Sequence, residues 1–269
     1  MKGRRLHPVC GDLVDAEPLE HDPEWVIVAI RPRRNELTRP NLRGRVEVLA
    51  ANLDAIVVVT ADLPPPDWFI VDRYLCAAEL MGVVSAVAFN KIDLGELHPA
   101  SARALEEYRE AGYVILHTSA REGLGVDALL DFLAGRRGIL VGQSGVGKSS
   151  LVNRLVERSL LPTAEISEKR REGRHTTVSS VMVALPNGGA VIDSPGVRDY
   201  APAVAEPAEV ARGYREIAAA APHCRFTDCR HLREPDCAVK ERVEQGAISS
   251  RRYESYRRLL ALAERLDRP

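Results

Sequence analysis

Apolar positions in the middle of the chain follow two different periods. Residues 53–60 and 83–89 form nearly continuous apolar runs, which is typical of strands buried on both faces. The stretch 68–81 between them has the spacing of an amphipathic helix. The alternation continues with helices expected over 100–111 and 126–133 and strands expected over 113–118 and 138–141. This pattern predicts an α/β fold, a mostly parallel sheet with helices on both faces.

The pattern changes toward both ends. After a helix expected over 148–156 come a charged loop and a β-hairpin whose strands are 178–185 and 190–192. Before residue 49 the chain is proline-rich, with one clear strand candidate at 25–30. After residue 200 come an alanine-rich helix, a Cys/His cluster and a last helix over 249–266. We therefore expect three domains, covering 1–48, 49–200 and 201–269.

Side chains at helical spacing divide the last helix into two faces. A core-facing stripe is expected from Tyr253, Tyr256, Leu260, Ala263 and Leu266. The arginines expected outside the stripe are Arg251, Arg252, Arg257 and Arg258.

Composition restricts the function only weakly. The formal net charge is −1 and 28% of residues are charged, which neither requires nor excludes a nucleic-acid partner. The apolar runs are far shorter than the ~20 residues that span a bilayer, and the basic first residues lead into no apolar signal core. We expect a soluble, cytoplasmic monomer with no membrane partner.

A glycine-rich loop follows the strand expected at 138–141. Its glycines let several backbone N–H groups turn toward one point, and the next helix presents its positive N-terminus there. Lys148 adds a mobile charge for the β and γ phosphates of a nucleotide and is a catalytic candidate, while Ser149 is placed to bind Mg²⁺. A flexible loop without a ligand is the weaker alternative. The expected phosphate-site residues are Gly142, Gln143, Ser144, Gly145, Val146, Gly147, Lys148, Ser149 and Ser150.

A second motif, Asn90-Lys91-Ile92-Asp93, follows another apolar strand. The Asp93 carboxylate would accept from N1–H and N2–H₂ of guanine, a pair of donors that adenine does not present. Asn90 would brace the loop and approach the N7 edge, and Lys91 would lie along the ring. Ser119 and Ala120 end the next strand, where the Ala120 N–H would reach guanine O6. The guanine motif precedes the phosphate loop, the reverse of an ordinary GTPase, which predicts a circularly permuted GTPase domain.

Further residues complete the expected nucleotide site. Asp193 ends an apolar strand and would hold Mg²⁺ with its water shell, and the Gly196 N–H would sense the γ-phosphate. Thr176 would close over Mg²⁺ and the γ-phosphate, unless its charged loop is simply solvated. Val197 occupies the place where many small GTPases carry a glutamine that orients water. His175 or a group from a partner would then position the attacking water.

Cys224, Cys229, His231 and Cys237 make a complete tetrahedral ligand set within a short span. Four protein ligands leave no place for water, so Zn²⁺ there would be structural and would add folding energy. His223 competes for the histidine place, and unliganded buried cysteines are the alternative.

These motifs resemble the ribosome-small-subunit-dependent, circularly permuted GTPases known as RsgA or YjeQ. The resembling segments are Pro8-Val9-Cys10-Gly11-Asp12, 31–40, Asn90-Lys91-Ile92-Asp93, 142–150, 173–177, 193–198 and the Cys/His set. The resemblance implies an OB-like N-terminal domain, a permuted GTPase domain and a helical zinc domain. It also implies GTP and GDP as ligands, with Mg²⁺ and one structural Zn²⁺. The implied role is late assembly of the small (30S) ribosomal subunit by binding its rRNA and leaving after GTP hydrolysis.

The N-terminal part departs from the resembled family, whose members usually have further strands before the segment matching 8–12. We therefore expect a partial, truncated OB-like domain. Its basic side chains are candidate phosphate contacts or a solvated charged face. They are Arg31, Arg33, Arg34 and Arg39.

Two other functions fit the sequence. A GTP-gated RNA-binding module with vestigial hydrolysis is suggested by Val197 and the short N-terminal segment. A GTPase that acts on the large subunit is the other, and the zinc motif and segment 31–40 argue against it. In the favoured interpretation, GTP fixes a ribosome-competent arrangement of the flanking domains, and arginines of the last helix supply part of the rRNA affinity.

Overall fold

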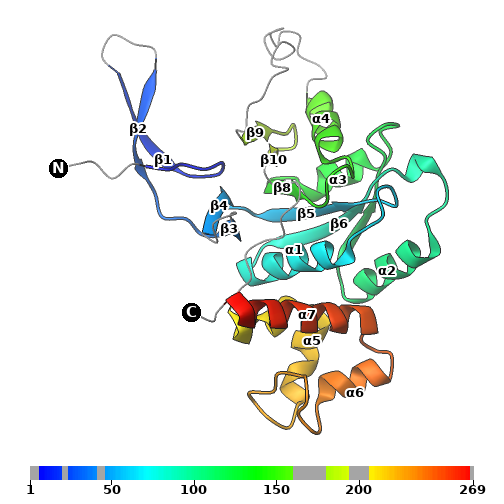
Figure 1. Ribbon diagram of the computed structural model, residues 1–269. Helices are drawn as coiled ribbons and strands as arrows, with labels where there is room; N and C mark the ends of the chain where they lie inside the picture. The colour runs from blue at the N-terminus through cyan, green and yellow to red at the C-terminus, as the bar shows by residue number, and fades with distance from the viewer. Residues whose placement is uncertain (1–5, 20–23, 41–45, 160–179, 194–205, 267–269) are drawn as a thin grey trace.

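The structure, a computed structural model, describes residues 6–19, 24–40, 46–159, 180–193 and 206–266. Its centre is a six-stranded sheet (Figure 1). In spatial order the strands are β7 (Val114–His117), β6 (Val84–Phe89), β5 (Ala55–Thr60), β8 (Arg137–Val141), β10 (Ala190–Asp193) and β9 (Val181–Ala184). All neighbours pair in parallel except β9, which pairs antiparallel with β10 at the edge. The predicted parallel sheet is confirmed, and so is the predicted hairpin, which is formed by β9 and β10.

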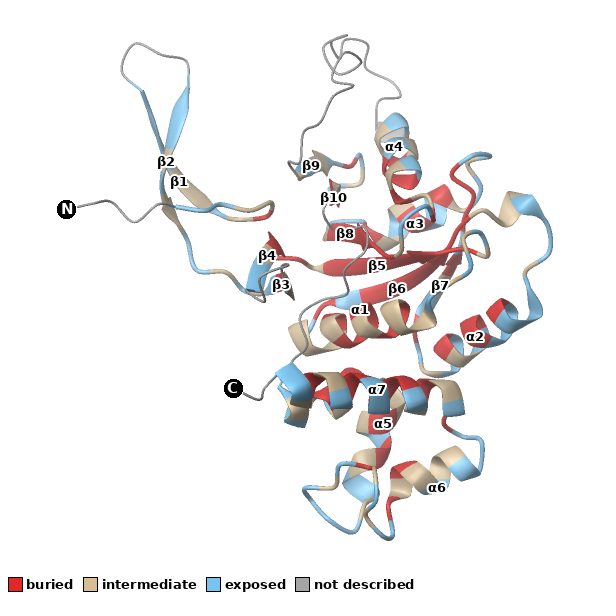
Figure 2. Cartoon of the chain, in the orientation of Figure 1, coloured by how far each residue is buried: buried red, intermediate tan, exposed pale blue. Residues whose placement is uncertain are grey.

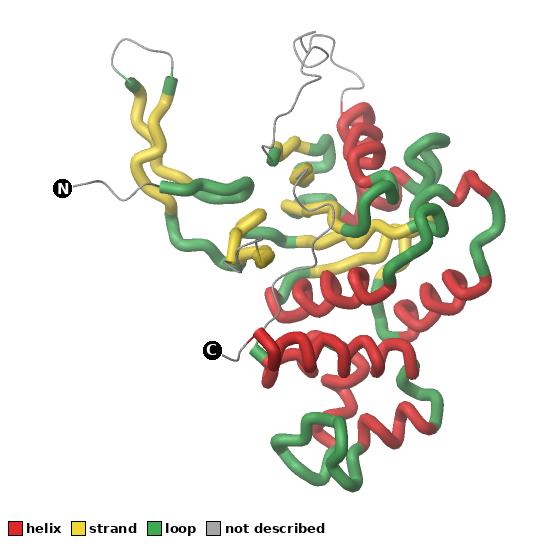
Figure 3. Tube along the Cα trace, in the orientation of Figure 1, coloured by secondary structure: helices red, strands yellow, loops and turns green. Residues whose placement is uncertain are grey.

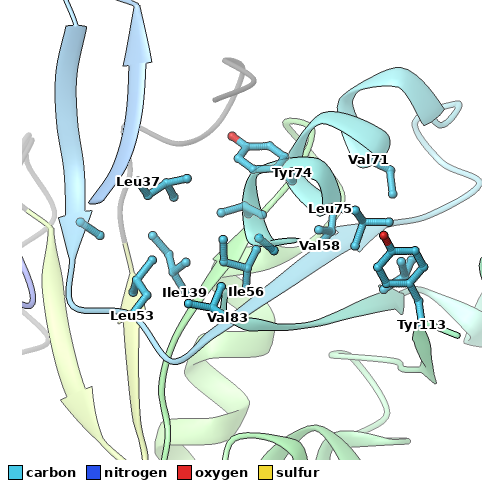
Figure 4. Close-up of a cluster of buried hydrophobic side chains, with 14 of the residues drawn as sticks. Leu37, Leu53, Ile56, Val58, Val71, Tyr74, Leu75, Val83, Tyr113 and Ile139 are labelled. Atoms are coloured by element: carbon cyan, nitrogen blue, oxygen red, sulfur yellow. The ribbon is translucent and has the colours of Figure 1, made fainter. Parts of the chain in front are cut away.

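Helices cover both faces of this sheet, as predicted. They are α1 (Trp68–Met81), α2 (Pro99–Glu110), α3 (Val126–Phe132) and α4 (Lys148–Ser159). Successive side chains of a strand point to opposite faces. In β5, Ile56 and Val58 therefore pack with α1 and α2 in one cluster, shown in Figure 4, whereas Val57 and Val59 pack with α3 and α4 in another. Every residue of β5 is buried because the strand lies between two helical layers.

Local chemistry sets both ends of α1. The Asp67 carboxylate accepts hydrogen bonds from the backbone N–H groups of Phe69 and Ile70, which have no partner within the helix. Gly82 ends the helix in the left-handed region, at φ 66°, where residues with a Cβ are strained. One face of α1 is anchored by Leu75, which is fully buried. Burial of such a side chain stabilises the fold by about 1.5–3 kcal/mol.

The N-terminal segment forms two separate antiparallel pairs of strands. They are β1 (Val14–Pro18) with β2 (Trp25–Ile30) and β3 (Glu36–Pro40) with β4 (Val46–Ala51). Of these four strands, only β2 was predicted from the sequence. β1 and β3 have five residues each and end in proline, and the register shift of the second pair leaves an extra residue, Leu49, in β4, so the alternation of apolar and polar residues is weak. The β1–β2 pair projects away from the body (Figure 3).

Asn52 joins this segment to the central domain. Its side chain is buried, accepts from the Arg34 backbone N–H at 2.8 Å and donates to the Gly11 carbonyl at 2.9 Å. Asn35 makes a reciprocal pair of bonds with the backbone of Leu53, at 2.8 and 2.9 Å. Gly11 itself has φ 96°, and a Cβ there would lie 1.9 Å from the Ala51 carbonyl oxygen. Side-chain amides thus hold three chain segments in one fixed arrangement.

The arginines proposed as phosphate contacts in this segment are all paired with carboxylates of the same chain. The pairs are Arg31–Asp15, Arg33–Asp12, Arg34–Asp54 and Arg39–Glu47. Asp12 has a side chain only 1% exposed, so its partner Arg33 compensates a buried charge. The geometry therefore favours a role for these arginines in holding the segment together rather than a free basic surface.

The C-terminal part is helical and packs against α1 (Figure 1). Its helices are the 3-10 helix η4 (Pro207–Gly213), α5 (Arg215–Ala220), the 3-10 helix η5 (Ala221–His223), α6 (Ala238–Glu244) and α7 (Ser250–Leu266). A third apolar cluster joins α5, α6, α7 and η4, with Tyr214 and Tyr256 at its centre. Among the described residues, no helix is long and apolar enough to cross a membrane.

Helix α7 carries both buried and exposed positions (Figure 2), and two expectations for it need correction. Leu266 was expected in the core stripe, but it lies in the last turn and is 60% exposed. Arg252 was expected outside the core, but it is only 1% exposed. Its guanidinium is buried because carboxylates of Asp72 and Glu216 surround it. Helical spacing could not show this, since both partners come from other helices. Arg257 and Arg258 are exposed as predicted.

Candidate nucleotide site and metal centre

The glycine-rich loop connects β8 to the first turn of α4. Gly142 has φ 127°, and a Cβ there would lie 2.1 Å from the carbonyl oxygen of Val59 on the neighbouring strand. Gly147 has φ 99°, and its Cβ would lie 2.3 Å from Nδ2 of Asn90. Glycine is thus required at these positions both for the turn and for the close approach of the neighbouring segments that carry Val59 and Asn90. The backbone of this loop turns at the N-terminus of α4, the arrangement that binds anions.

Lys148 lies within the curve of this loop. It is 9% exposed, and its Nζ donates to the carbonyl oxygens of Gly142 and Gln143, both at 2.7 Å. An ammonium group in this place is positioned to exchange these carbonyls for phosphate oxygens. Val146 anchors the loop, because it is fully buried in the cluster beneath α3 and α4. Ser144 and Ser150 are exposed and Ser149 is half-buried.

Asn90 connects the guanine motif to the phosphate loop. Its Nδ2 donates to the Val146 carbonyl at 2.8 Å. Its Oδ1 accepts from the Ala120 backbone N–H at 3.1 Å and from the Thr118 hydroxyl at 3.2 Å. The side chain is 1% exposed, so it braces three loops from inside. This supports the predicted bracing role and places the amide group against protein rather than against a ligand edge.

Lys91 makes a second link between the same loops. Its Nζ donates to the carbonyl oxygens of Leu63 and Gly145, both at 2.7 Å. Its backbone has φ 66°, which turns the chain sharply into the 3-10 helix η1 (Ile92–Leu94) that carries Asp93. The stem of Lys91 therefore spans the distance between the guanine loop and the phosphate loop.

Asp93 and Ser119 are hydrogen-bonded to each other. The Ser119 hydroxyl donates to Asp93 Oδ1 at 2.5 Å and accepts from the Glu122 backbone N–H at 3.0 Å. Asp93 itself is half-buried. The Ala120 N–H, which sequence analysis assigned to guanine O6, donates to Asn90 in this structure.

Asp193 ends β10, whose Val191 and Ile192 pair with Gly138 and Ile139 of β8. The carboxyl end of β10 therefore lies beside the start of the phosphate loop. His175, Thr176, Gly196 and Val197 lie outside the described residues.

One group of residues near this site was missed from sequence. The loop between β5 and α1 approaches the phosphate loop: the Asp67 backbone N–H donates to Gln143 Oε1 at 3.2 Å, and a Cβ on Gly145 would lie 3.5 Å from Pro64. The only available signal was the proline run 64–66 directly after a buried strand. Ligands bind beyond the carboxyl ends of parallel strands, and β5 lies between the strands that carry the two motifs.

The predicted metal ligands come together in the C-terminal part. One ligand atom from each of Cys224, Cys229, His231 and Cys237 lies within 4.8 Å of the others. His231 Nδ1 is 3.5 Å from both Cys224 Sγ and Cys237 Sγ, and these sulfurs are 3.8 Å apart. Three thiols and one imidazole at these separations fit tetrahedral Zn²⁺. Burial raises the pKa of the Cys229 thiol to about 12 and lowers the pKa of His231.

Helix α7 holds the loop of the candidate metal ligands in place. The Tyr256 hydroxyl donates to the Arg230 carbonyl at 2.8 Å, and the Tyr253 hydroxyl donates to the His231 carbonyl. His231 has φ 58°, a left-handed conformation that these contacts help to maintain. The two tyrosines of the predicted stripe therefore serve the candidate metal centre as well as the core.

The parallel sheet, the phosphate loop and the guanine motif in inverted order define a circularly permuted GTPase. The family model described as RsgA GTPase matches residues 30–202, more than half of the chain. A relative from Azotobacter vinelandii, named Small ribosomal subunit biogenesis GTPase RsgA, is 44% identical over 238 residues, which are 88% of this chain and 69% of the relative. A relative of the same name from Actinobacillus succinogenes is 42% identical over 238 residues, 88% of this chain and 68% of that protein. This chain belongs to the RsgA GTPase family.

Solved structures agree with this assignment. YjeQ from Thermotoga maritima is similar with a TM-score of 0.73 and 31% identity, covering 98% of this chain and 86% of that one. YloQ, described as a circularly permuted GTPase, is similar with a TM-score of 0.70 and 27% identity, covering 100% of this chain and 85% of that one. The predicted fold class and the assignment as a GTPase are confirmed.

Proposed function

We propose that this chain hydrolyses GTP to GDP and phosphate as a late assembly factor of the small ribosomal subunit, and that its nucleotide state controls binding to and release from the subunit and its rRNA. The observation that carries the proposal is the convergence of the guanine motif and the phosphate loop, which are linked by Asn90 and Lys91. The relatives' name supports the ribosomal part.

The residues have separate proposed roles. Asp93, fixed by Ser119, selects guanine, and the amides of the phosphate loop with Lys148 hold the phosphates. Ser149 and Asp193, together with Thr176, would hold Mg²⁺, which neutralises phosphate charge when bound. His175 remains the candidate for positioning the attacking water.

We further propose Zn²⁺ at the Cys/His set, with a structural role. The support is the donor set itself, because three sulfurs and a nitrogen around one point suit Zn²⁺ and leave no open position. The division into domains 1–48, 49–200 and 201–269, the monomeric state and the cytoplasmic location remain predictions.

GTP hydrolysis measured with purified 30S subunits, with 50S subunits and with neither tests enzyme and partner together. We expect turnover to rise with 30S only. A rise with 50S alone would contradict the proposed partner.

A GTP-gated RNA-binding module with vestigial hydrolysis is the second candidate, favoured by Val197, which cannot hydrogen-bond water. In that case 30S binding depends on GTP while turnover stays at the unstimulated level. Equal 30S affinity with GDP and with a non-hydrolysable GTP analogue would contradict nucleotide control in both candidates.

A further inference from the structure

A buried cluster of charged side chains lies between α7 and the central domain. Asp72 of α1 is fully buried, and its Oδ1 accepts from Arg252 Nη1 at 2.7 Å. Arg252 donates its other two nitrogens to Glu216 of α5, at 2.7 and 3.0 Å. Although burial alone would lower the pKa of Arg252, the two carboxylates raise it well above its ordinary value. The Arg252 guanidinium therefore stays protonated at every physiological pH.

A second arginine of α7 binds the same carboxylate. Arg251 Nη1 donates to Asp72 Oδ2 at 3.2 Å, and its Nε donates to Glu107 of α2 at 2.7 Å. The Tyr108 hydroxyl donates to Asp72 Oδ1 at 2.6 Å. One carboxylate on α1 thus receives hydrogen bonds from α2 and from two adjacent residues of α7.

A buried cluster of charges such as this one fixes the orientation of α7 on α1 more than it adds to the binding energy between them. The apolar cluster around Tyr214 and Tyr256 already gives α7 a buried contact surface, and apolar contacts tolerate small shifts. A shift of α7 would instead take both arginines away from the buried Asp72 carboxylate and leave it the Tyr108 hydroxyl. A buried charge that loses its opposite charges is costly in a low-dielectric interior. The position of the C-terminal part on α1 is therefore sharply defined.

The same end of α1 is attached to the candidate nucleotide site. The N-cap Asp67 donates its backbone N–H to Gln143 Oε1 in the phosphate loop at 3.2 Å. Four residues earlier, the Leu63 carbonyl shares the Lys91 ammonium with the Gly145 carbonyl. Asp72 lies only five residues after Asp67, which is about 7.5 Å along a helix. The contact of Asp67 with the phosphate loop is thus made at the N-cap of α1, and the contacts of Asp72 with α7 are made within the first two turns of the same helix.

We propose that the first two turns of α1 couple the phosphate loop to the orientation of the zinc-binding C-terminal part, with Asp72 as a positioning residue for nucleotide binding. The coupling rests on the proposed nucleotide site and adds a route that does not use the segment following Asp193. Because coupling free energies are reciprocal, a partner that fixes α7 on α1 also favours the bound form of the phosphate loop.

The test is the affinity of the full-length protein for a fluorescent GDP analogue in Asp72→Asn, Gln143→Ala and the double variant. We expect Asp72→Asn to weaken binding by about fivefold or more. The double variant should lose no more than the larger single loss, because both changes interrupt the same connection. Glu79→Gln is the matched control: it removes the ion pair with Arg215 of α5 at the other end of α1. It should change affinity by less than about twofold.

Wild-type affinity in Asp72→Asn, an equal loss in Glu79→Gln, or additive losses in the double variant would each overturn the coupling. Zinc content and thermal melting are measured on each variant. If Asp72→Asn does not fold, Arg251→Ala replaces it with the same expected loss, since Arg251 binds the same carboxylate and its side chain is 27% exposed. A wild-type protein that binds no GDP analogue would instead overturn the proposed function.

Discussion

Asn90 should contribute more to stability and to nucleotide binding than its size suggests. Asn90→Ala removes the bond to the Val146 carbonyl and the bond from the Ala120 N–H, both in a site where the side chain is 1% exposed. A buried main-chain group left without a partner costs about 1–3 kcal/mol, so the two groups together cost about 2–6 kcal/mol. The loss also removes one of the two links between the phosphate loop and the guanine loop and leaves the one made by Lys91.

The assay is thermal unfolding combined with GDP binding. For a chain of this size 1 kcal/mol corresponds to about 2–4 °C in Tm, so the lower bound is a fall of about 4–8 °C. Asn90→Asp, which replaces the donor facing the Val146 carbonyl with an acceptor, should be at least as harmful. Asn153→Ala on the exposed face of α4 is the control and should melt like wild type. A Tm for Asn90→Ala within about 1 °C of wild type would refute the reasoning.

Three further predictions follow from other contacts. Asp93→Asn should lower GDP affinity by about 10- to 100-fold, because it removes one charge-assisted hydrogen bond of about 1.5–3 kcal/mol. Competition between GDP and ADP should show that the preference for guanine is lost. Cys237→Ser should remove stoichiometric zinc and lower the Tm, whereas Cys10→Ser, outside the Cys/His set, should retain the metal; zinc absent from protein purified without chelators would contradict the site. Burial alone would raise the pKa of Asp12, but hydrogen bonds from Arg33 and from the Val9 N–H lower it. The Arg33–Asp12 pair therefore contributes stability above about pH 3.9, and this stability is lost as the pH falls through the lowered pKa of Asp12. The measurement is hydrogen exchange of residues 9–16 as a function of pH. The exchange should depend less on pH in Arg33→Ala than in Arg31→Ala, because the ion pair of Arg31 is exposed. Equal profiles in the two variants would show that burial of the Arg33–Asp12 pair is unimportant.

The central sheet and the loops at its edge could be predicted because their signals are local. Strands such as β5 are apolar at every position, and the phosphate loop requires glycines at Gly142 and Gly147 for reasons that the backbone alone imposes. The Cys/His set could be predicted because thiols and an imidazole at short spacing have few other uses. The strands β1, β3 and β4 could not, because β1 and β3 are short and end in proline and an extra residue, Leu49, interrupts the alternation of β4.

The sequence by itself determined the proposed chemistry of this protein: which loop we propose to bind phosphate, which carboxylate we propose to select guanine and which side chains are the candidate metal ligands. Only the tertiary structure decided how these parts are joined. Arg252 is a charged residue, of a type usually found at the surface, but it lies in the core. Its partners are distant in the chain, since Asp72 lies 180 positions away and Glu216 lies 36 away. Gln143 meets Asp67 across 76 positions in the same way. Pairings between distant segments depend on how the helices pack on the sheet, and no local pattern in the sequence records that packing.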